Sequence, residues 1–380
     1  MTARTQEVSS GRVTLLVSRV LARNAGPMVL DGTNTYVIRH PDSNRVVVVD
    51  PGPDDDDHLR AVVAHGEVEL ILLTHYHPDH SDAAARLSSM TGAPVRAVDR
   101  GFCVGAEVLQ SDEQIVGGGT RIEIVGTPGH TADSVSFYLE EDRPLDHEGA
   151  RESAGSMLTG DTILGRGTTV IAHPDGSVAP YLTSLKRLGQ FGSALVLPGH
   201  GPVLDDLAVV STQYYEVRTE MLRVVEDVVT RFMTSSPPRE VTVRAVSDAV
   251  YSTLPRHLRF AAEMSVSAQL VHLGVPVNSG PSAFDSIVRA AQPSSPPPAD
   301  PGREQVAPVT AASTLGAWLD HPEGGPLLRN LLTEVGVSEG ILAPLAKLPL
   351  EKLMLMSKGL VTQELVDDLV NRAAHGGGAG

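Results

Sequence analysis

The chain has 380 residues, which is enough for two or three domains that each bury a core. A hydrophobic content of 41 % and a charged content of 20 % are typical of globular proteins, and no apolar run approaches the roughly 20 residues that a membrane span needs. The net charge of -16 disfavours broad attraction to polyanions, and the single cysteine, Cys103, excludes both an internal disulfide and a cysteine-rich metal site.

The first eleven residues, MTARTQEVSSG, are polar and lack the apolar core of a secretory signal, so we expect a cytoplasmic protein with no membrane partner. From about residue 12 to 205, short β-branched runs alternate with Gly and Pro turns and a few helical stretches, which is typical of an α/β domain. Strands are predicted at 13–17, 34–39, 46–49, 68–73, 121–125, 134–138, 157–159 and 194–197, and helices at 57–64, 82–91, 180–188 and 207–233.

The second part of the chain is helical and is interrupted by a proline-rich segment. Two prolines in SSPPRE end the long helix, and two amphipathic stretches follow between residues 242 and 291. The segment QPSSPPPADPGREQVAPV reads as a semi-extended linker. We therefore predict a catalytic domain at 12–235, a small domain at 236–291, a linker at 292–312 and a small helical domain at 313–375.

Ligand-type side chains follow four of the predicted strands, each time after a turn. The carboxyl ends of strands in α/β folds are where sites assemble, so we expect these side chains to meet. A polar surface turn with incidental histidines is the alternative for HYHPDH alone, but it does not explain the recurrence at three further strand ends. The residues concerned are His75, His77, Asp79, His80, His130, Asp161 and His200.

Imidazole nitrogen and carboxylate oxygen suit Zn²⁺, at ligand distances of about 2.0 to 2.2 Å. Seven such side chains exceed one tetrahedral site, whereas two ions sharing a bridging carboxylate would use them all and leave positions for water. Open coordination positions indicate catalysis, because structural zinc is usually closed by four protein ligands. The sequence therefore predicts a cofactor of two Zn²⁺ per chain.

The motif H-x-H-x-D-H, present as HYHPDH, and the later motifs GTPGHT, TGD and PGHG resemble those of the metallo-β-lactamase superfamily over about residues 12 to 205. The resemblance implies a four-layer αββα sandwich. It also implies that His75, His77 and His130 hold one metal, that Asp79, His80 and His200 hold the second, and that Asp161 bridges them. Asp50, in VVVDPG, matches an aspartate that supports the ligands from an earlier strand end.

Differences between branches of that superfamily narrow the interpretation. Antibiotic-hydrolysing members generally lack the bridging aspartate that stands here as Asp161, and the di-iron branch usually has Glu where His77 stands. Nucleases with a large inserted cassette need far more residues between Asp161 and His200 than this chain has. Drug hydrolysis, a di-iron centre and the cassette nucleases are therefore disfavoured.

A closer resemblance is to the branch called β-lactamase-like protein 2, through NAGPMVLDGTNTYVI, THYHPDHSDAA, GTPGHTADSVSFYL and GDTILGRGTTVI. It extends to about residue 280, because a small winged-helix-like domain follows the catalytic domain in that branch. The usual late pattern HL-x-K-L-x-x-E-G is weakened here to AQLVHLGVPV.

The predicted function is a metal-dependent hydrolase in which a metal-bridging hydroxide attacks an ester or thioester of a small molecule. Asp79 would bind metal and also orient the nucleophile or accept its proton. One alternative is single-strand endoribonuclease activity, with RNA as the partner, and another is a non-catalytic binding or regulatory protein. Substrate contacts are predicted at the mouth of the site for Asn34, Thr35, Arg166, Thr168 and Thr169.

Overall fold

The computed structural model describes residues 10–26, 28–145, 154–171, 173–252, 259–277, 309–310, 313–319, 321, 324–325, 327–329, 350 and 369–370. The chain divides into two compact units, Met1–Asn278 and Ser279–Gly380, and the first contains every predicted site residue. In the second, helix α9 (Leu315–Leu319) buries Trp318, whose indole N–H donates to the carbonyl of Thr310 at 2.8 Å. Most of the predicted linker and most of the predicted C-terminal helical domain lie outside the described residues.

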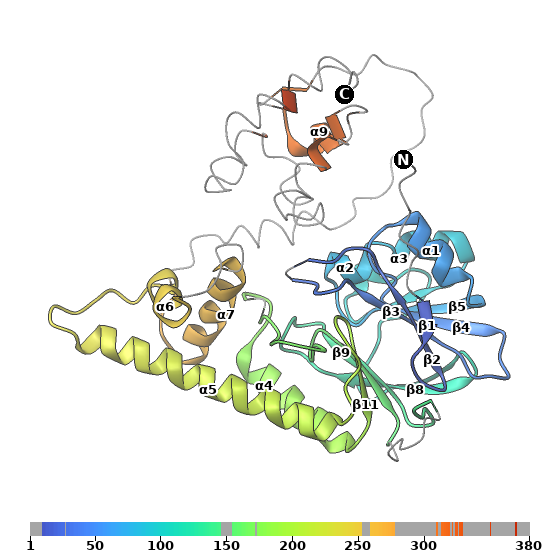
Figure 1. Ribbon diagram of the computed structural model, residues 1–380, viewed down its shortest axis with the longest axis horizontal. Helices are drawn as coiled ribbons and strands as arrows, with labels where there is room; N and C mark the ends of the chain where they lie inside the picture. The colour runs from blue at the N-terminus through green and yellow to red at the C-terminus, as the bar shows by residue number, and fades with distance from the viewer. Residues whose placement is uncertain are drawn as a thin grey trace, which may run out of the picture. The chain divides into compact units, whose positions relative to one another are not determined.

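Two β-sheets form the centre of the first unit (Figure 1). One has six strands in chain order: β1 (Ser10–Arg12), β2 (Val17–Leu21), β3 (Asn34–Ile38), β4 (Arg45–Val49), β5 (Glu67–Leu72) and β6 (Val95–Arg96). The other has five strands in the order β11 (Leu195–Pro198), β10 (Ser156–Gly160), β9 (Val135–Leu139), β8 (Thr120–Gly126) and β7 (Gln114–Gly117). The helices of this unit are α1 (Asp56–Val63), α2 (Pro78–Ser81), α3 (Ala84–Thr91), α4 (Val178–Leu188), α5 (Leu207–Thr234), α6 (Val243–Val250) and α7 (Arg259–His272).

The sheets and helices form four layers because each sheet is apolar on both faces. In β4, Val47 and Val49 point into the core between the sheets, whereas Val46 and Val48 pack beneath α1 and α3. This alternation explains why the strand reads as an unbroken run of valines. The outer face of the second sheet is covered in the same way by α4 and the start of α5. The predicted helix–sheet–sheet–helix arrangement is confirmed.

Most predicted elements are present, with two kinds of error. The strand predicted at 13–17 is wrong, because the amides of Val13 and Thr14 turn back to the carbonyl of Val17 and β2 begins only there. The short edge strands β1, β6 and β7 have no counterpart in the prediction. β7 alternates exposed and partly buried residues, so it shows no apolar run in the sequence.

The direction of the strands brings their carboxyl ends together. β4 and β5 are parallel, as are β10 and β11. β8 runs in the same direction as β10, because both are antiparallel to β9. The loops that leave β4, β5, β8, β10 and β11 therefore open at one edge of the sandwich.

The long helix α5 leaves the sandwich and continues into the small helical unit. Its N-terminus is capped by Asp206, which accepts a hydrogen bond from the amide of Val209 at 3.0 Å. Its C-terminal half packs with α6 and α7 around Val225, Phe232, Val246 and Val266. Among the described residues of this unit, only helices are found at the position of the predicted winged-helix-like domain.

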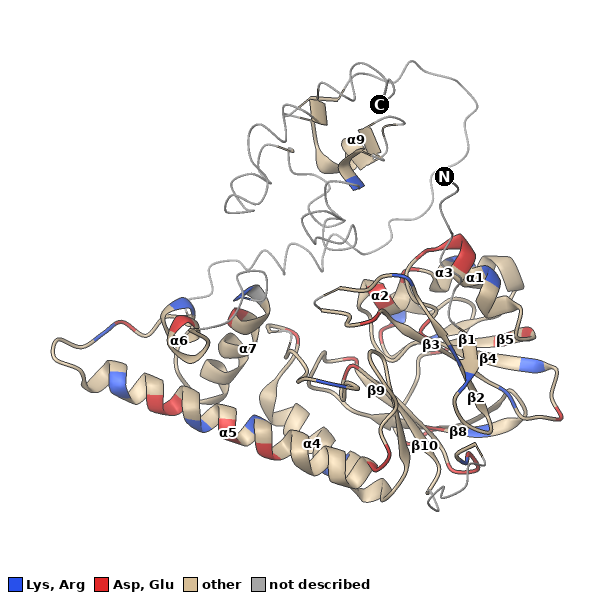
Figure 2. Ribbon diagram, viewed as in Figure 1, with Lys and Arg blue, Asp and Glu red and all other residues tan. Residues whose placement is uncertain are grey.

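Charged residues of both signs are interspersed along the described helices, strands and loops (Figure 2). Several arginines are paired with carboxylates: the half-buried Arg96 with Glu113, and the exposed Arg100 with Glu107. Among the described helices, none is long and apolar enough to cross a membrane.

Candidate metal centre

All seven predicted ligand side chains meet at the edge of the sandwich where the strand ends converge. The loop after β5 and the short helix α2 supply His75, His77, Asp79 and His80, and three further strand ends supply His130, Asp161 and His200. Their ligand atoms form three groups, within each of which all atoms lie within 4.8 Å of one another. The groups are His75, His77 and His130; His75, His80 and Asp161; and Asp79, His80 and His200.

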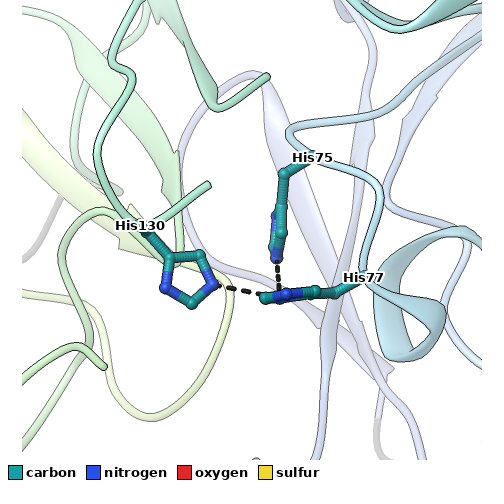
Figure 3. A group of neighbouring side chains, drawn as sticks. All are labelled: His75, His77 and His130. Atoms are coloured by element: carbon teal, nitrogen blue, oxygen red, sulfur yellow. Dashed lines mark hydrogen bonds between the residues drawn. The ribbon is translucent and has the colours of Figure 1, made fainter. Parts of the chain in front are cut away.

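The first group is a triangle of imidazoles whose ring nitrogens point toward one another (Figure 3). Nδ1 of His77 lies 2.9 Å from Nε2 of His75 and 3.0 Å from Nε2 of His130. Burial and the neighbouring imidazoles hold the pKa of His75 well below its usual range, and they lower the pKa of His77 to about 3. These rings are therefore neutral at physiological pH and have lone pairs available for a cation.

The group of Asp79, His80 and His200 combines two imidazoles with a carboxylate. Nε2 of His200 lies 3.1 Å from Nε2 of His80 and 3.1 Å from Oδ2 of Asp79. Burial opposes charge on both rings, but the carboxylates outweigh it and raise the pKa of His200 to about 10 and that of His80 well above its usual range. This pocket therefore favours positive charge, which a divalent cation would also supply.

Asp161 lies between the three-histidine group and the group of Asp79, His80 and His200. Its Oδ1 lies 3.4 Å from Nε2 of His80 and 3.4 Å from Nε2 of His200, and its Oδ2 lies 3.8 Å from Nε2 of His130. The Oδ1 atom is buried and has no hydrogen-bond partner in the part of the chain that the structure describes. A buried carboxylate oxygen that accepts no hydrogen bond is costly, and a cation beside it would remove that cost.

Hydrogen bonds behind the rings set the tautomers. Nδ1 of His80 faces Oδ2 of Asp50 at 2.8 Å, Nδ1 of His200 faces the carbonyl of Gly32 at 3.1 Å, and Nδ1 of His130 faces the carbonyl of Val170 at 2.5 Å. Since these oxygens can only accept, each Nδ1 carries the hydrogen and each neutral ring presents a bare Nε2.

This arrangement fits metal ions better than it fits a closed hydrogen-bond network. The Nε2 atoms of His80 and His200 are only 3.1 Å apart, so two N–H groups face each other when both rings are charged, and neither ring can donate when both are neutral. A cation bound by both lone pairs resolves this conflict, and imidazole with carboxylate is a donor set suited to zinc.

Asp50 lies behind the site, as expected from its place after β4. Oδ1 accepts a hydrogen bond from the amide of Thr74 at 2.8 Å, and Oδ2 accepts from the Thr74 hydroxyl at 2.7 Å as well as facing His80. Its backbone is left-handed, with a φ of 51°, a conformation that Asp and Asn tolerate better than most residues. Its carbonyl accepts a hydrogen bond from the Thr35 hydroxyl at 2.6 Å.

The residues predicted at the mouth separate into two groups. Thr168 and Arg166 are exposed, and Arg166 forms a two-pronged ion pair with Asp31 at 2.5 and 2.8 Å. Asn34, Thr35 and Thr169 are buried instead, which corrects the expectation that their side chains line the mouth. Their polar atoms donate to main-chain carbonyls: Asn34 to Pro198 and Gly201, Thr35 to Asp50, and Thr169 to Asp161.

Sequence reasoning missed the groups that orient the ligands. The carbonyls of Gly32 and Val170 could not be found, because a main-chain oxygen leaves no residue-type signal. Thr74 could have been noticed, since it directly precedes His75 at the end of β5. His58, which stands in none of the ligand motifs, is buried, and its Nε2 lies 2.8 Å from the Thr35 hydroxyl.

Comparison with known proteins agrees with this geometry. The sequence model of the metallo-beta-lactamase superfamily matches residues 28–145. A beta-lactamase-like protein 2 homolog from Caenorhabditis elegans is 30% identical over 270 residues, covering 68% of this chain and 83% of the relative. An atrochrysone carboxyl ACP thioesterase from Aspergillus chevalieri is 30% identical over 257 residues, covering 64% of this chain and 76% of the relative.

Among solved structures, a beta-lactamase domain protein from Burkholderia ambifaria is similar with a TM-score of 0.54 and 18% identity, covering 70% of this chain and 88% of that protein. The fold and the relatives define a metal-dependent hydrolase built on an α/β sandwich of two sheets and flanking helices. The chain belongs to the metallo-β-lactamase superfamily.

Proposed function

We propose that the protein is a dinuclear zinc hydrolase that cleaves an ester or thioester of a small molecule. The observation that carries this proposal is the pair of ligand groups sharing Asp161, since one carboxylate oxygen faces His80 and His200 while the other faces His130. Two groups joined by a carboxylate are the arrangement expected of a two-metal hydrolytic site.

In this proposal His75, His77 and His130 hold one ion, Asp79, His80 and His200 hold the other, and Asp161 bridges them. When bound, the ions would lower the pKa of a water molecule and polarise the carbonyl of the substrate. The hydrogen bonds to Asp50, Gly32 and Val170 keep the histidine lone pairs directed inward.

Asp79 is the residue best placed to handle a proton. Its side chain is 27% exposed, whereas those of His80 and His200 are fully buried, so Asp79 lies on the open side of the site. Burial raises the pKa of Asp79, but the adjacent His80 and His200 outweigh this and lower it to about 2. The carboxylate is therefore ionised at neutral pH and can orient the attacking water or accept its proton.

Two observations favour a small ester or thioester substrate. A relative that is 30% identical over 257 residues is named as an acyl carrier protein thioesterase. In addition, the net charge is -16 and surface arginines such as Arg23, Arg86 and Arg187 are paired with aspartates, so these cations are already neutralised. Single-stranded RNA, the alternative substrate, would be attracted by unpaired basic groups.

Arg166 and Thr168 are proposed as substrate contacts at the mouth. Both are exposed on the loop between β10 and α4, and the loop begins with Asp161. Because Asp31 occupies both prongs of the Arg166 guanidinium, an anionic group of a substrate would have to displace that carboxylate.

The domain boundaries also remain proposals. We propose that α6 and α7 form the core of the small winged-helix-like domain at 236–291, because they share an apolar core with the end of α5. The C-terminal helical domain at 313–375 is proposed as a separate unit, in accord with the division of the chain after Asn278.

The test is metal analysis of the purified protein combined with a substrate panel of esters, thioesters, lactones and single-stranded RNA. We expect two zinc ions per chain, turnover of an ester or thioester, and loss of that turnover on treatment with a chelator followed by recovery with Zn²⁺. Chelator-sensitive and salt-sensitive cleavage of RNA alone would replace the substrate assignment. Absence of bound metal together with absence of turnover would favour a binding protein.

A further inference from the structure

Two side chains of helix α5 hold the loop that carries Asp161. Residues 161–170, the bridge loop, run from Asp161 at the end of β10 to Val170, whose carbonyl accepts from His130. The Tyr214 hydroxyl accepts from the amide of Leu164 at 3.1 Å and lies 2.8 Å from the Leu164 carbonyl. One turn later in α5, Nη2 of Arg218 donates to the carbonyl of Thr169 at 2.5 Å.

Arg218 is unusual because its charge is buried. The residue is 6% exposed, and no carboxylate pairs with it in the part of the chain that the structure describes. Its guanidinium carbon lies 5.4 Å from the ring centre of Tyr181, whose hydroxyl donates to the carbonyl of Thr162 at 2.9 Å. Burying a guanidinium that pairs with no carboxylate costs desolvation free energy, and an apolar side chain could fill the same space without that cost.

The bridge loop connects Arg218 to candidate metal ligands at both of its ends, Asp161 at its start and His130 beside Val170 at its end. The Thr169 hydroxyl donates to the carbonyl of Asp161 at 2.8 Å, next to the carbonyl that Arg218 holds. The following residue, Val170, provides the carbonyl that faces Nδ1 of His130 at 2.5 Å. Arg218 therefore fixes one peptide unit that borders directly on the hydrogen bond orienting His130.

We propose that Arg218 is a positioning residue for the metal centre: its buried guanidinium holds the bridge loop so that His130 presents Nε2 and Asp161 faces both ligand groups. This inference rests on the proposed dinuclear centre. A residue that orients a ligand through an outer hydrogen bond affects metal affinity by about 10- to 100-fold. The same reasoning gives Tyr214 a weaker share of the role, since it holds the middle of the loop at Leu164 and Gly167.

The experiment compares Arg218→Met with Arg218→Lys and with the control Arg223→Met. Arg223 lies on the same helix but is exposed and pairs only with Glu220, three residues earlier, within the described residues. The dissociation constants of Zn²⁺ are measured by competition with a chromophoric chelator, and thermal unfolding of the metal-free proteins is measured in parallel. Histidine ring nitrogen spectra of the metal-free protein report the tautomer of His130.

We expect Arg218→Met to weaken binding of at least one Zn²⁺ by about 10- to 100-fold, to change the ring nitrogen signals of His130, and to leave a folded protein. Arg218→Lys should recover part of the affinity, because an ammonium group can still donate to Thr169, and Arg223→Met should match the wild type. If Arg218→Met does not fold, Arg218→Lys and Tyr214→Phe are measured in the same way and are expected to weaken binding at least several-fold.

Wild-type zinc affinity and an unchanged His130 tautomer in the folded Arg218 variants, with only a lower unfolding temperature, would overturn the inference and leave Arg218 a structural role. A wild-type protein that binds no zinc would instead overturn the proposed metal centre. The two failures are therefore distinguishable.

Discussion

The substitution Asp50→Asn tests whether hydrogen bonds behind the site control its metal affinity. Asp50 accepts from the amide and hydroxyl of Thr74 and from Nδ1 of His80, at 2.8, 2.7 and 2.8 Å. In the asparagine variant, Oδ1 can still accept from the Thr74 amide, but an NH₂ group then faces Nδ1 of His80. The imidazole must either lose this bond or move its hydrogen to Nε2, the atom that points at Asp161 and His200.

The expected loss is about 10- to 100-fold in zinc affinity, or about 1.4 to 2.7 kcal/mol, which is the usual effect of changing a group that orients a metal-bound histidine. Backbone strain should not contribute to this loss of zinc affinity, because asparagine tolerates the left-handed conformation of residue 50 as well as aspartate does. The assay is chelator competition for Zn²⁺, with turnover of the best substrate measured at saturating and at limiting metal.

Asp112→Asn is a matched control, since Asp112 also has a positive φ, of 67°, but is exposed and pairs with Arg187 at the surface. Its zinc affinity should equal that of the wild type. If Asp50→Asn binds zinc as tightly as the control and keeps full activity at limiting metal, the tautomer argument is refuted.

Four further predictions address other parts of the site. Asp161→Ala should lose bound metal and activity together, and near-normal turnover with full metal content would contradict the bridging role. Gly199→Ala should weaken zinc binding, because the added Cβ would lie 2.7 Å from both Oδ1 of Asp161 and Cε1 of His80, and 3.1 Å from the backbone carbonyl carbon of Gly160; metal titration checks this. Burial lowers the pKa of His58 to about 4 from an ordinary value of 6.5, so between these pH values the unfolded chain takes up a proton that the folded chain does not. The free energy of unfolding therefore falls as the pH drops from 6.5 toward 4. Urea unfolding at several pH values should show that this free energy depends less steeply on pH in His58→Gln than in the wild type. Asp31→Ala should free Arg166 and lower KM by about 1.5- to 5-fold for anionic substrates only, and an equal change for neutral substrates would contradict contact with Arg166.

The two-sheet fold could be predicted from the sequence because its strands carry a strong local signal. β4 is apolar at every position after Arg45, since the valines of this strand contact the inter-sheet core and the helices in turn. The edges of the sheets could not be predicted in the same way. β7 has exposed Gln114 and Val116, so its place depends on pairing with β8 and not on its own apolar pattern.

The buried supporting residues show what local sequence does not reveal. Asn34 and Thr35 are small polar residues at the start of a strand, which the sequence places equally well at the mouth or behind it. Only the approach of the loop after β11 buries Asn34 against Pro198 and Gly201. In the same way, Arg218 is an ordinary residue of an amphipathic helix until the bridge loop covers it.

The sequence by itself identified the seven candidate ligand side chains that meet in the structure, because metal binding requires particular side chains and these stand at the exits of apolar strands. His75, His77, Asp79 and His80 lie so close in the chain that one turn must bring them together. Tertiary structure alone decided how these ligands are oriented, since the carbonyls of Gly32 and Val170 come from loops far away in the chain. Main-chain oxygen is the same in every residue, so no sequence pattern could have identified those two partners.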